Sequence, residues 1–156
     1  MMRVRALTAI VVGLLLVTTA TSAAHADDPH DVHPAIAQAL REIPGGILID
    51  PEHAVWPEFD MALTATDATP LSPRSVGSCA TGRICAYLGT GLTSMYASWG
   101  VCGVLPVPSG QTMRSMANAR PSGYAQARNG SSIVATASAG GWTNVYSTVT
   151  SIRCVL

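Results

Sequence analysis

The sequence predicts an all-β fold for its second half, a small sandwich built from Greek keys and preceded by a short helix and strand-like segments. Eleven of the fourteen glycines lie within residues 74–156, where they separate short runs rich in Val, Ile, Thr, Tyr and Trp. Such runs are typical of many short strands joined by turns. No helical periodicity of useful length interrupts them. We therefore expect eight strands, at residues 83–88, 93–98, 101–105, 112–118, 122–127, 131–137, 142–147 and 149–155.

The N-terminus predicts export. A basic start is followed by an apolar run that ends at about Val17, and small residues then lead to Ala24-His25-Ala26. This is the pattern of a signal peptide over residues 1–26 with an A-x-A cleavage site. The apolar run is shorter than the ~20 residues that cross a bilayer, so we expect no membrane span. The mature protein is then secreted and runs from residue 27 to residue 156.

Charge divides the mature chain into two parts. Residues 27–73 hold all nine acidic residues and Arg41, a net charge of −8, whereas residues 74–156 hold six arginines and no acid, a net charge of +6. We therefore predict an acidic N-terminal extension over 27–73 and a basic β domain over 74–156. Opposite charges attract. Either the extension is a solubilising tail, or it packs on the basic domain through charge and through Phe59, Met61 and Leu63.

Local patterns predict the elements of the extension. Pro34 to Ile43 reads as a helix, with Pro in its first turn and a stop at Pro44-Gly45-Gly46. Strand-like segments follow at 46–50 and 59–66. Residues 51–57 contain two prolines, and we expect them to form no central strand. A linker over 67–78 marks the change in composition.

An internal repeat suggests a duplicated four-strand unit. Tyr87 precedes Ser115 by 28 residues, and Tyr124 precedes Ser151 by 27. Both serines lie in an apolar-x-Ser-apolar frame.

The four cysteines, Cys79, Cys85, Cys102 and Cys154, predict two disulfides in an exported protein. A zinc site is disfavoured because no histidine follows His53 and no C-x-x-C pairs occur. Four cysteines allow three pairings. The chain-entropy stabilisation is ~6.6 kcal/mol for Cys79–Cys85 with Cys102–Cys154 and ~7.8 kcal/mol for Cys79–Cys102 with Cys85–Cys154, and this difference favours neither pairing clearly. A bridge from Cys79 to Cys85 requires the chain to reverse near Thr81-Gly82.

The basic domain offers little catalytic chemistry. It contains no Asp, Glu, His or Lys, so a catalytic base would have to come from His53 or the acidic extension. We therefore expect no enzyme and no catalytic residue. No phosphate-binding loop is present, and six scattered arginines read as solvated surface. Accordingly, we expect no cofactor, no metal and no nucleic-acid partner.

Several residues carry a resemblance to a known family: Cys79-x-x-Gly82-x-x-Cys85-x-Tyr87, the segment Pro44-Gly45-Gly46, Ser115 and Ser151. This set resembles the βγ-crystallin-type secreted bacterial peptidase inhibitors, whose prototype inhibits metalloproteinases. The similarity covers about residues 35–154. It implies two packed Greek-key motifs, in each of which a serine, here Ser115 or Ser151, pins a folded hairpin. It also favours pairing Cys79 with Cys85 and Cys102 with Cys154.

The chain departs from this family in two ways. It lacks the second closely spaced cysteine pair that closes the reactive loop of the prototype. The inhibitory residues of the family therefore have no counterpart here. Calcium binding, common among crystallin relatives, is not expected either, because no carboxylate side chain follows Asp67.

These observations lead to the expectation of a secreted peptidase inhibitor-like protein whose partner is an extracellular peptidase, in particular a metalloproteinase. The candidate inhibitory loop is Gly103-Val104-Leu105-Pro106, anchored by Cys102 and stiffened by proline. The same segment also reads as a connection between the two motifs with an apolar plug. The alternative function is a structural or cell-envelope crystallin-like module with no peptidase target.

Overall fold

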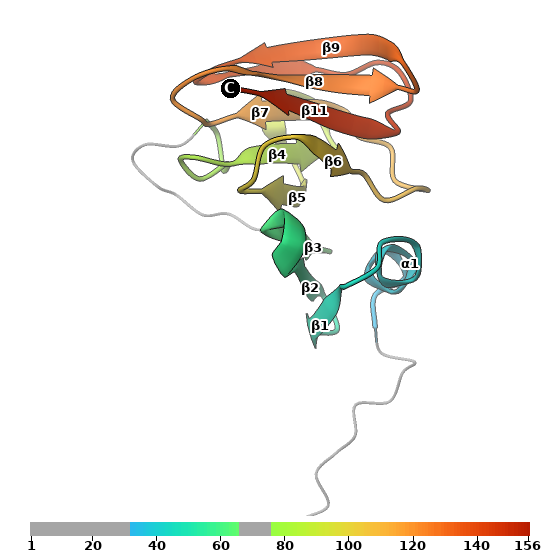
Figure 1. Ribbon diagram of the computed structural model, residues 1–156. Coiled ribbons are helices and arrows are strands. Elements are labelled where there is room, and N and C mark those ends of the chain that lie inside the picture. The colour runs from blue at the N-terminus through green and yellow to red at the C-terminus, as the bar shows by residue number, and fades with distance from the viewer. Residues whose placement is uncertain (1–31, 66–75) are drawn as a thin grey trace, which may run out of the picture.

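A computed structural model of the chain describes residues 32–65 and 76–156 (Figure 1). The predicted signal peptide, most of the predicted linker and the predicted boundary at residue 73 lie outside the described residues. Within them, no helix has the length and apolar character needed to cross a membrane.

One helix, eleven strands and two short helical turns occur in the described residues: α1 (Pro34–Glu42), β1 (Ile47–Asp50), β2 (His53–Trp56), η1 (Pro57–Phe59), β3 (Met61–Thr64), β4 (Ile84–Tyr87), η2 (Thr90–Leu92), β5 (Met95–Trp99), β6 (Val104–Pro106), β7 (Ser115–Asn118), β8 (Tyr124–Asn129), β9 (Ser132–Ser138), β10 (Gly141–Asn144) and β11 (Ser151–Val155). Each of the eight strand segments predicted for the basic domain overlaps one of these strands, with ends that differ by up to three residues. The expected β class is confirmed.

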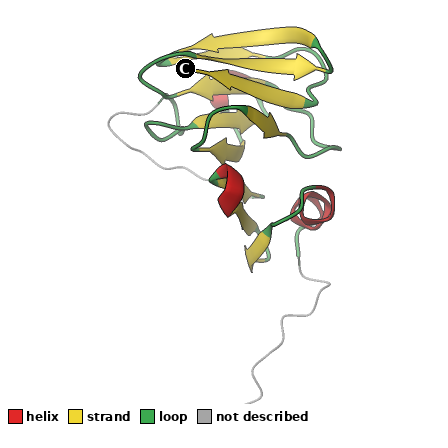
Figure 2. Cartoon of the chain, viewed as in Figure 1, coloured by secondary structure: helices red, strands yellow, loops and turns green. Residues whose placement is uncertain are grey.

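The strands form two antiparallel sheets, seen as layers in Figure 2. The larger sheet has the order β1-β2-β3-β5-β4-β7-β10, and the smaller has the order β6-β11-β8-β9. Two four-strand units, β4–β7 and β8–β11, pair in the same way: in each, the first strand lies between the second and the fourth. The third strand of each unit, β6 or β10, pairs instead in the sheet of the other unit.

The acidic segment is part of the larger sheet. Its last described strand, β3, pairs with β5 of the basic half, with Met61 opposite Trp99 and Leu63 opposite Ala97. Both Met61 and Leu63 are buried, and Phe59 packs partly buried against the same core. For the described residues, the interpretation that this segment packs on the basic domain is confirmed.

A charge pair reinforces the same junction. The Arg83 guanidinium donates to the Asp60 carboxylate at 3.1 Å, to the Asp60 carbonyl oxygen and to Ser98 Oγ at 3.2 Å. The amide of Gly100 also donates to the Asp60 carbonyl oxygen, at 3.0 Å. An arginine of the basic half therefore holds the chain just before β3, as the charge division suggested.

The prediction that residues 51–57 form no central strand is wrong. Residues 51–57 contain a strand, β2, that pairs with β1 on one side and β3 on the other. Pro51 and Pro57 lie just outside β2, so neither proline occupies a ladder position that requires an N–H donor.

The proposed match between Tyr87 and Tyr124 is also wrong. Tyr87 lies opposite Ser115, but the residue opposite Ser151 is Arg128, and Tyr124 lies opposite Val155 at the other end of β11. The two units repeat in strand pairing, whereas the tyrosines occupy different positions in it.

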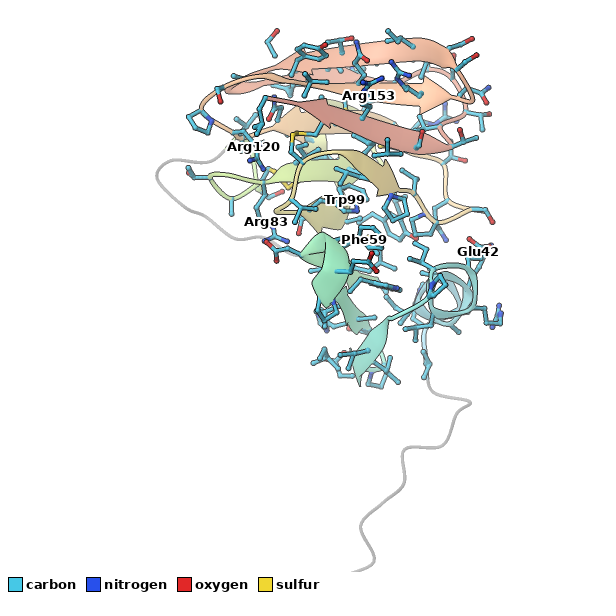
Figure 3. All side chains as sticks on the ribbon, viewed as in Figure 1. Glu42, Phe59, Arg83, Trp99, Arg120 and Arg153 are labelled. Carbon is cyan, nitrogen blue, oxygen red and sulfur yellow. A yellow bond between two sulfur atoms is a disulfide. The ribbon has the colours of Figure 1, made fainter. Side chains whose placement is uncertain are left out.

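The predicted helix is present and covers the β1–β3 end of the sheet. It buries Ile36, Ala39 and, at its C-cap, Ile43, whose carbonyl oxygen accepts a 2.8 Å hydrogen bond from Trp56 Nε1. Figure 3 labels Glu42 at the end of this helix. The Glu42 carboxylate accepts bonds from the Ser109 amide at 2.7 Å, from the Ser109 hydroxyl and from Gln38 Nε2 at 2.9 Å. Glu42 thus ties α1 to the β6–β7 connection.

The Glu42 contacts predict a pH-dependent stability. Hydrogen bonds from the Ser109 side chain, from Gln38 and from the Ser109 amide hold the pKa of Glu42 below its ordinary value of 4.5. The stabilisation is present above that unfolded value and is lost as pH falls through the lower folded value. We expect Glu42→Gln to lower the Tm at pH 7 and to have a much smaller effect at about pH 3. Scanning calorimetry would measure this, with Glu58→Gln, an exposed carboxylate, as the control. An equal Tm loss at both pH values would contradict it.

Candidate functional site

The predicted inhibitory segment forms an edge strand. Within the described residues, β6 lies at one end of the smaller sheet and pairs only with β11, with Val104 opposite Arg153 and Leu105 opposite Ile152. The side chain of Val104 is exposed at 70%, whereas Leu105 is buried in the core. The candidate loop is therefore an extended edge strand, and strand alternation turns Leu105 inward. Of these two side chains, only Val104 is open to a partner.

A disulfide fixes the start of β6. Cys102 is bonded to Cys154 of β11, with the two Cα atoms 4.9 Å apart, and the Cys154 amide donates to the Gly103 carbonyl oxygen at 2.7 Å. Gly103 has φ of 138°, a backbone conformation that a residue with a side chain rarely adopts. The backbone of Gly103 is thus held between a covalent bridge and a strand pair.

An open hollow lies beside this disulfide. It is lined by Cys102, Gly103, Val104 and the end of the chain from Arg153 to Leu156. Leu156 and Arg153 are exposed, and Figure 3 labels Arg153 on β11. This surface therefore offers aliphatic side chains beside one cationic guanidinium. The sequence indicated the Cys102 segment but not the contribution of the chain's last residues, which approach it only through the pairing of β6 with β11.

Ser115 holds the connection between β4 and β5. The buried hydroxyl of Ser115 donates to the Gly89 carbonyl oxygen at 2.6 Å and accepts from the Leu92 amide at 3.0 Å. These bonds satisfy two backbone groups of the folded connection, which is the role that the resemblance implies for a serine at this place.

In the second unit, the corresponding bonds are made by Thr150 and not by the predicted Ser151. Thr150 Oγ1 accepts from the Gly130 amide at 2.9 Å and donates to the Arg128 carbonyl oxygen at 3.3 Å. Ser151 is the first residue of β11 and lies opposite Arg128 and Pro106. The sequence carried a signal for Thr150, since threonine supplies the same hydroxyl as serine one position earlier.

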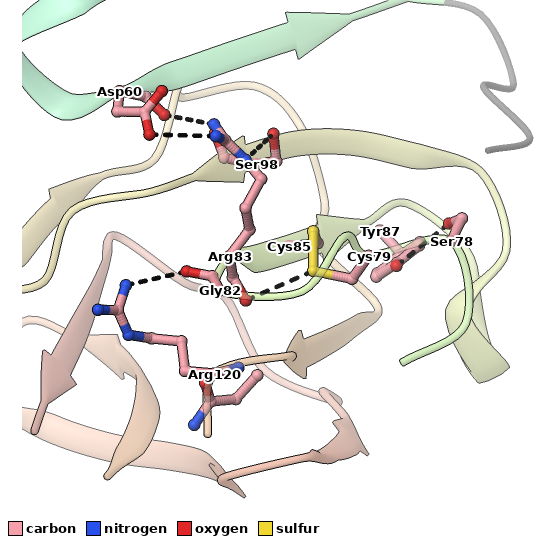
Figure 4. The surroundings of a disulfide bond; sticks show 10 residues. Asp60, Ser78, Cys79, Gly82, Arg83, Cys85, Tyr87, Ser98 and Arg120 are labelled. Carbon is pink, nitrogen blue, oxygen red and sulfur yellow. Dashed lines mark hydrogen bonds and ion pairs between the residues drawn. A yellow bond between two sulfur atoms is a disulfide. The ribbon is translucent and has the colours of Figure 1, made fainter. Parts of the chain in front are cut away.

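The Cys79–Cys85 bridge closes a tight turn before β4 (Figure 4). Its Cα atoms are 5.7 Å apart, and Gly82 has φ of 85° at the reversal predicted for Thr81-Gly82. The pairing favoured by the resemblance is confirmed for both disulfides. Arg120 donates to the carbonyl oxygens of Gly82 and Gly100 at 3.1 and 2.8 Å, which fixes the turn to the sheet.

This turn covers a small second core on the outer face of the larger sheet. Cys79, Cys85 and Tyr87 are buried there with Ala117 and Ala119. Burial raises the pKa of the Tyr87 hydroxyl, which accepts a 3.2 Å hydrogen bond from Ser78 Oγ. The Cys79–Tyr87 motif therefore forms part of the packing on one face of the larger sheet.

His53 is the first residue of β2, directly after the turn that joins β1 to β2. Its Nδ1 lies 2.7 and 2.8 Å from the two carboxylate oxygens of Asp50. The Glu52 amide and then His53 hold the pKa of Asp50 below its usual range. These contacts brace a hairpin turn. Across residues 32–65 and 76–156, no group of three or more His, Cys, Asp or Glu side chains is arranged to hold a metal ion.

The two hydroxyls predict unequal stability losses. Ser115→Ala leaves a partly buried carbonyl oxygen and a partly buried amide without their partner, so we expect a loss of about 1–3 kcal/mol in the free energy of unfolding. Thr150→Val removes exposed bonds, so we expect about 0.5–1 kcal/mol. Urea denaturation followed by fluorescence would give both values. A larger loss for Thr150→Val than for Ser115→Ala would show that Ser115 does not hold its connection in this way.

Comparisons with known proteins add no relative: no protein family, no curated protein and no solved structure matches this chain.

Proposed function

We propose that this protein is a secreted βγ-crystallin-like double Greek key that inhibits a peptidase of the metalloproteinase class through the exposed edge of β6. The fold part of the proposal is supported by the exchange of β6 and β10 between the two sheets. It is also supported by the hydroxyls of Ser115 and Thr150, which act at matching connections of the two units.

The inhibitory part of the proposal rests on the fixed, extended backbone of β6. Its backbone is already extended, because β11 pairs with one side and the Cys102–Cys154 bridge precedes it. Extended peptides bind proteins by adding a strand to an open edge, with alternate side chains entering pockets. A segment that is held in this conformation before binding loses little conformational entropy on binding.

Val104 is the side chain that would enter a peptidase pocket. It is aliphatic and points away from the core, whereas Leu105 anchors β6 to the sandwich. The neighbouring Arg153 and Leu156 would then contact the rim of the peptidase cleft. This division between an anchor and a contact residue follows directly from the strand alternation.

Enzyme titration tests the proposal. We expect the purified protein to inhibit a thermolysin-type metallopeptidase at near-equimolar micromolar concentrations, and Val104→Asp to weaken inhibition at least about tenfold, equivalent to about 1.4 kcal/mol. Ile133→Asp, which alters another exposed aliphatic side chain, on β9, should inhibit as the unmodified protein does. A serine peptidase should be titrated in parallel.

Two results would reject the proposal. Absence of inhibition of both peptidase classes at these concentrations would favour the alternative of a structural or cell-envelope module. Inhibition that survives Val104→Asp unchanged would place the contact surface elsewhere on the molecule.

A further inference from the structure

Strand β1 presents three consecutive aliphatic residues to solvent. Ile47, Leu48 and Ile49 are exposed at 52%, 40% and 61%. The strand is the last of the larger sheet, and among the described residues it pairs only with β2 (Figure 1). An exposed apolar edge strand is a template for pairing with another chain, and soluble proteins usually protect such edges with charge, proline or a covering element.

The exposed side chains lie on both faces of the sheet. Ile47 is registered with Val55, which lies opposite Ala62 on the next strand, so these three share one face. Leu48 is registered with the buried Ala54 and therefore lies on the opposite face. A partner that packed on one face would leave the other exposed. Only a strand added along the edge of β1 covers both.

The edge of β1 is regular at its first two residues. Ile47 and Leu48 keep an unbroken register with β2, and the irregularity falls between Leu48 and Asp50. Bulges protect an edge by twisting it away. Here the bulge lies at the Asp50 end and leaves the first half of the strand straight.

We propose that β1 pairs with β1 of a second copy of this chain, antiparallel and about a two-fold axis close to Leu48. A strand that covers β1 must itself carry aliphatic side chains on both faces and have an open edge, and β1 has both properties. Such a contact is self-complementary, as a two-fold interface requires.

Charge selects the antiparallel arrangement. Asp50 is the only charged residue of β1. In a parallel pair the two Asp50 carboxylates would lie side by side, which is unfavourable. In the antiparallel pair centred on Leu48 they lie at opposite ends, about 13 Å apart, beyond the screening length of about 8 Å at physiological salt. Leu48 then meets Leu48 of the second copy, and Ile47 meets Ile49, the residue at which the register of β1 with β2 shifts.

The dimer is expected to be weak and to leave the proposed inhibitory edge free. A contact made by one four-residue strand per subunit falls at the small end of protein interfaces, so we expect a dissociation constant on the order of 10–100 μM. β6 belongs to the other sheet. Self-association and peptidase inhibition are therefore separable, and each can fail without the other.

Sedimentation equilibrium of the purified protein between about 10 μM and 1 mM tests the pairing. We expect the average mass to rise towards that of two chains. Leu48→Lys should remain monomeric at every concentration, with its folded state verified by circular dichroism. Ile133→Lys is the matched control, because Ile133 is an exposed aliphatic residue on the edge strand β9, and it should associate as the unmodified protein does.

Cross-linking tests the register. With Leu48→Cys, a short bis-maleimide should join two chains, because directly opposed residues have Cβ atoms about 5 Å apart. Ile133→Cys should give no such product under the same conditions. The proposal is overturned if the unmodified protein stays monomeric at about 1 mM, or if Leu48→Lys associates as strongly as the unmodified protein. Equal cross-linking of both cysteine variants would also overturn it.

Discussion

The pairing of β3 with β5 joins the acidic segment to the basic half, and the arrangement of the sheet depends on it. The Asp60–Arg83 contact lies at this junction, but it is partly exposed, and exposed ion pairs contribute only about 0–1 kcal/mol. Burial of Met61 and Leu63 contributes more, at about 1.5–3 kcal/mol for each side chain. Apolar burial and the strand ladder therefore hold the segment, while the charges orient it. Without β3, the edge of β5 would be open and the place of β1, β2 and α1 would be lost.

The second half is held differently, by covalent bridges and by exchanged strands. Each four-strand unit gives its third strand to the sheet of the other, so neither sheet is complete without both units. The Cys102–Cys154 bridge lies where the exchange brings β6 beside β11. A rigid extended edge at β6 is thus a consequence of how the sandwich closes. The proposed inhibitory contact uses this rigidity, and the proposed β1 pairing uses an edge at the end of the other sheet.

Much of this fold could be predicted from the sequence because glycines mark the turns, and β-branched and aromatic residues are concentrated in the strands. The helix, the strands of the second half and the reversal at Gly82 followed from these local signals. Two predictions were wrong because they depended on the exact position of a residue. The prolines around β2 flank the strand and do not interrupt it, and Thr150 makes the contacts expected of Ser151. The burial of Leu105 and the approach of Leu156 to Val104 depend on pairing with β11, which no local pattern encodes.

Native-state hydrogen exchange tests most directly whether the acidic segment and the basic half form one cooperative sheet. If they do, the hydrogen-bonded amides of β3 should exchange with the same free energy of opening, and the same response to denaturant, as those of β5 and β4 in the centre of the sheet. Exchange of the β3 amides through a separate opening, orders of magnitude faster than that of β4, would show that the segment is a detachable appendage and would contradict this account.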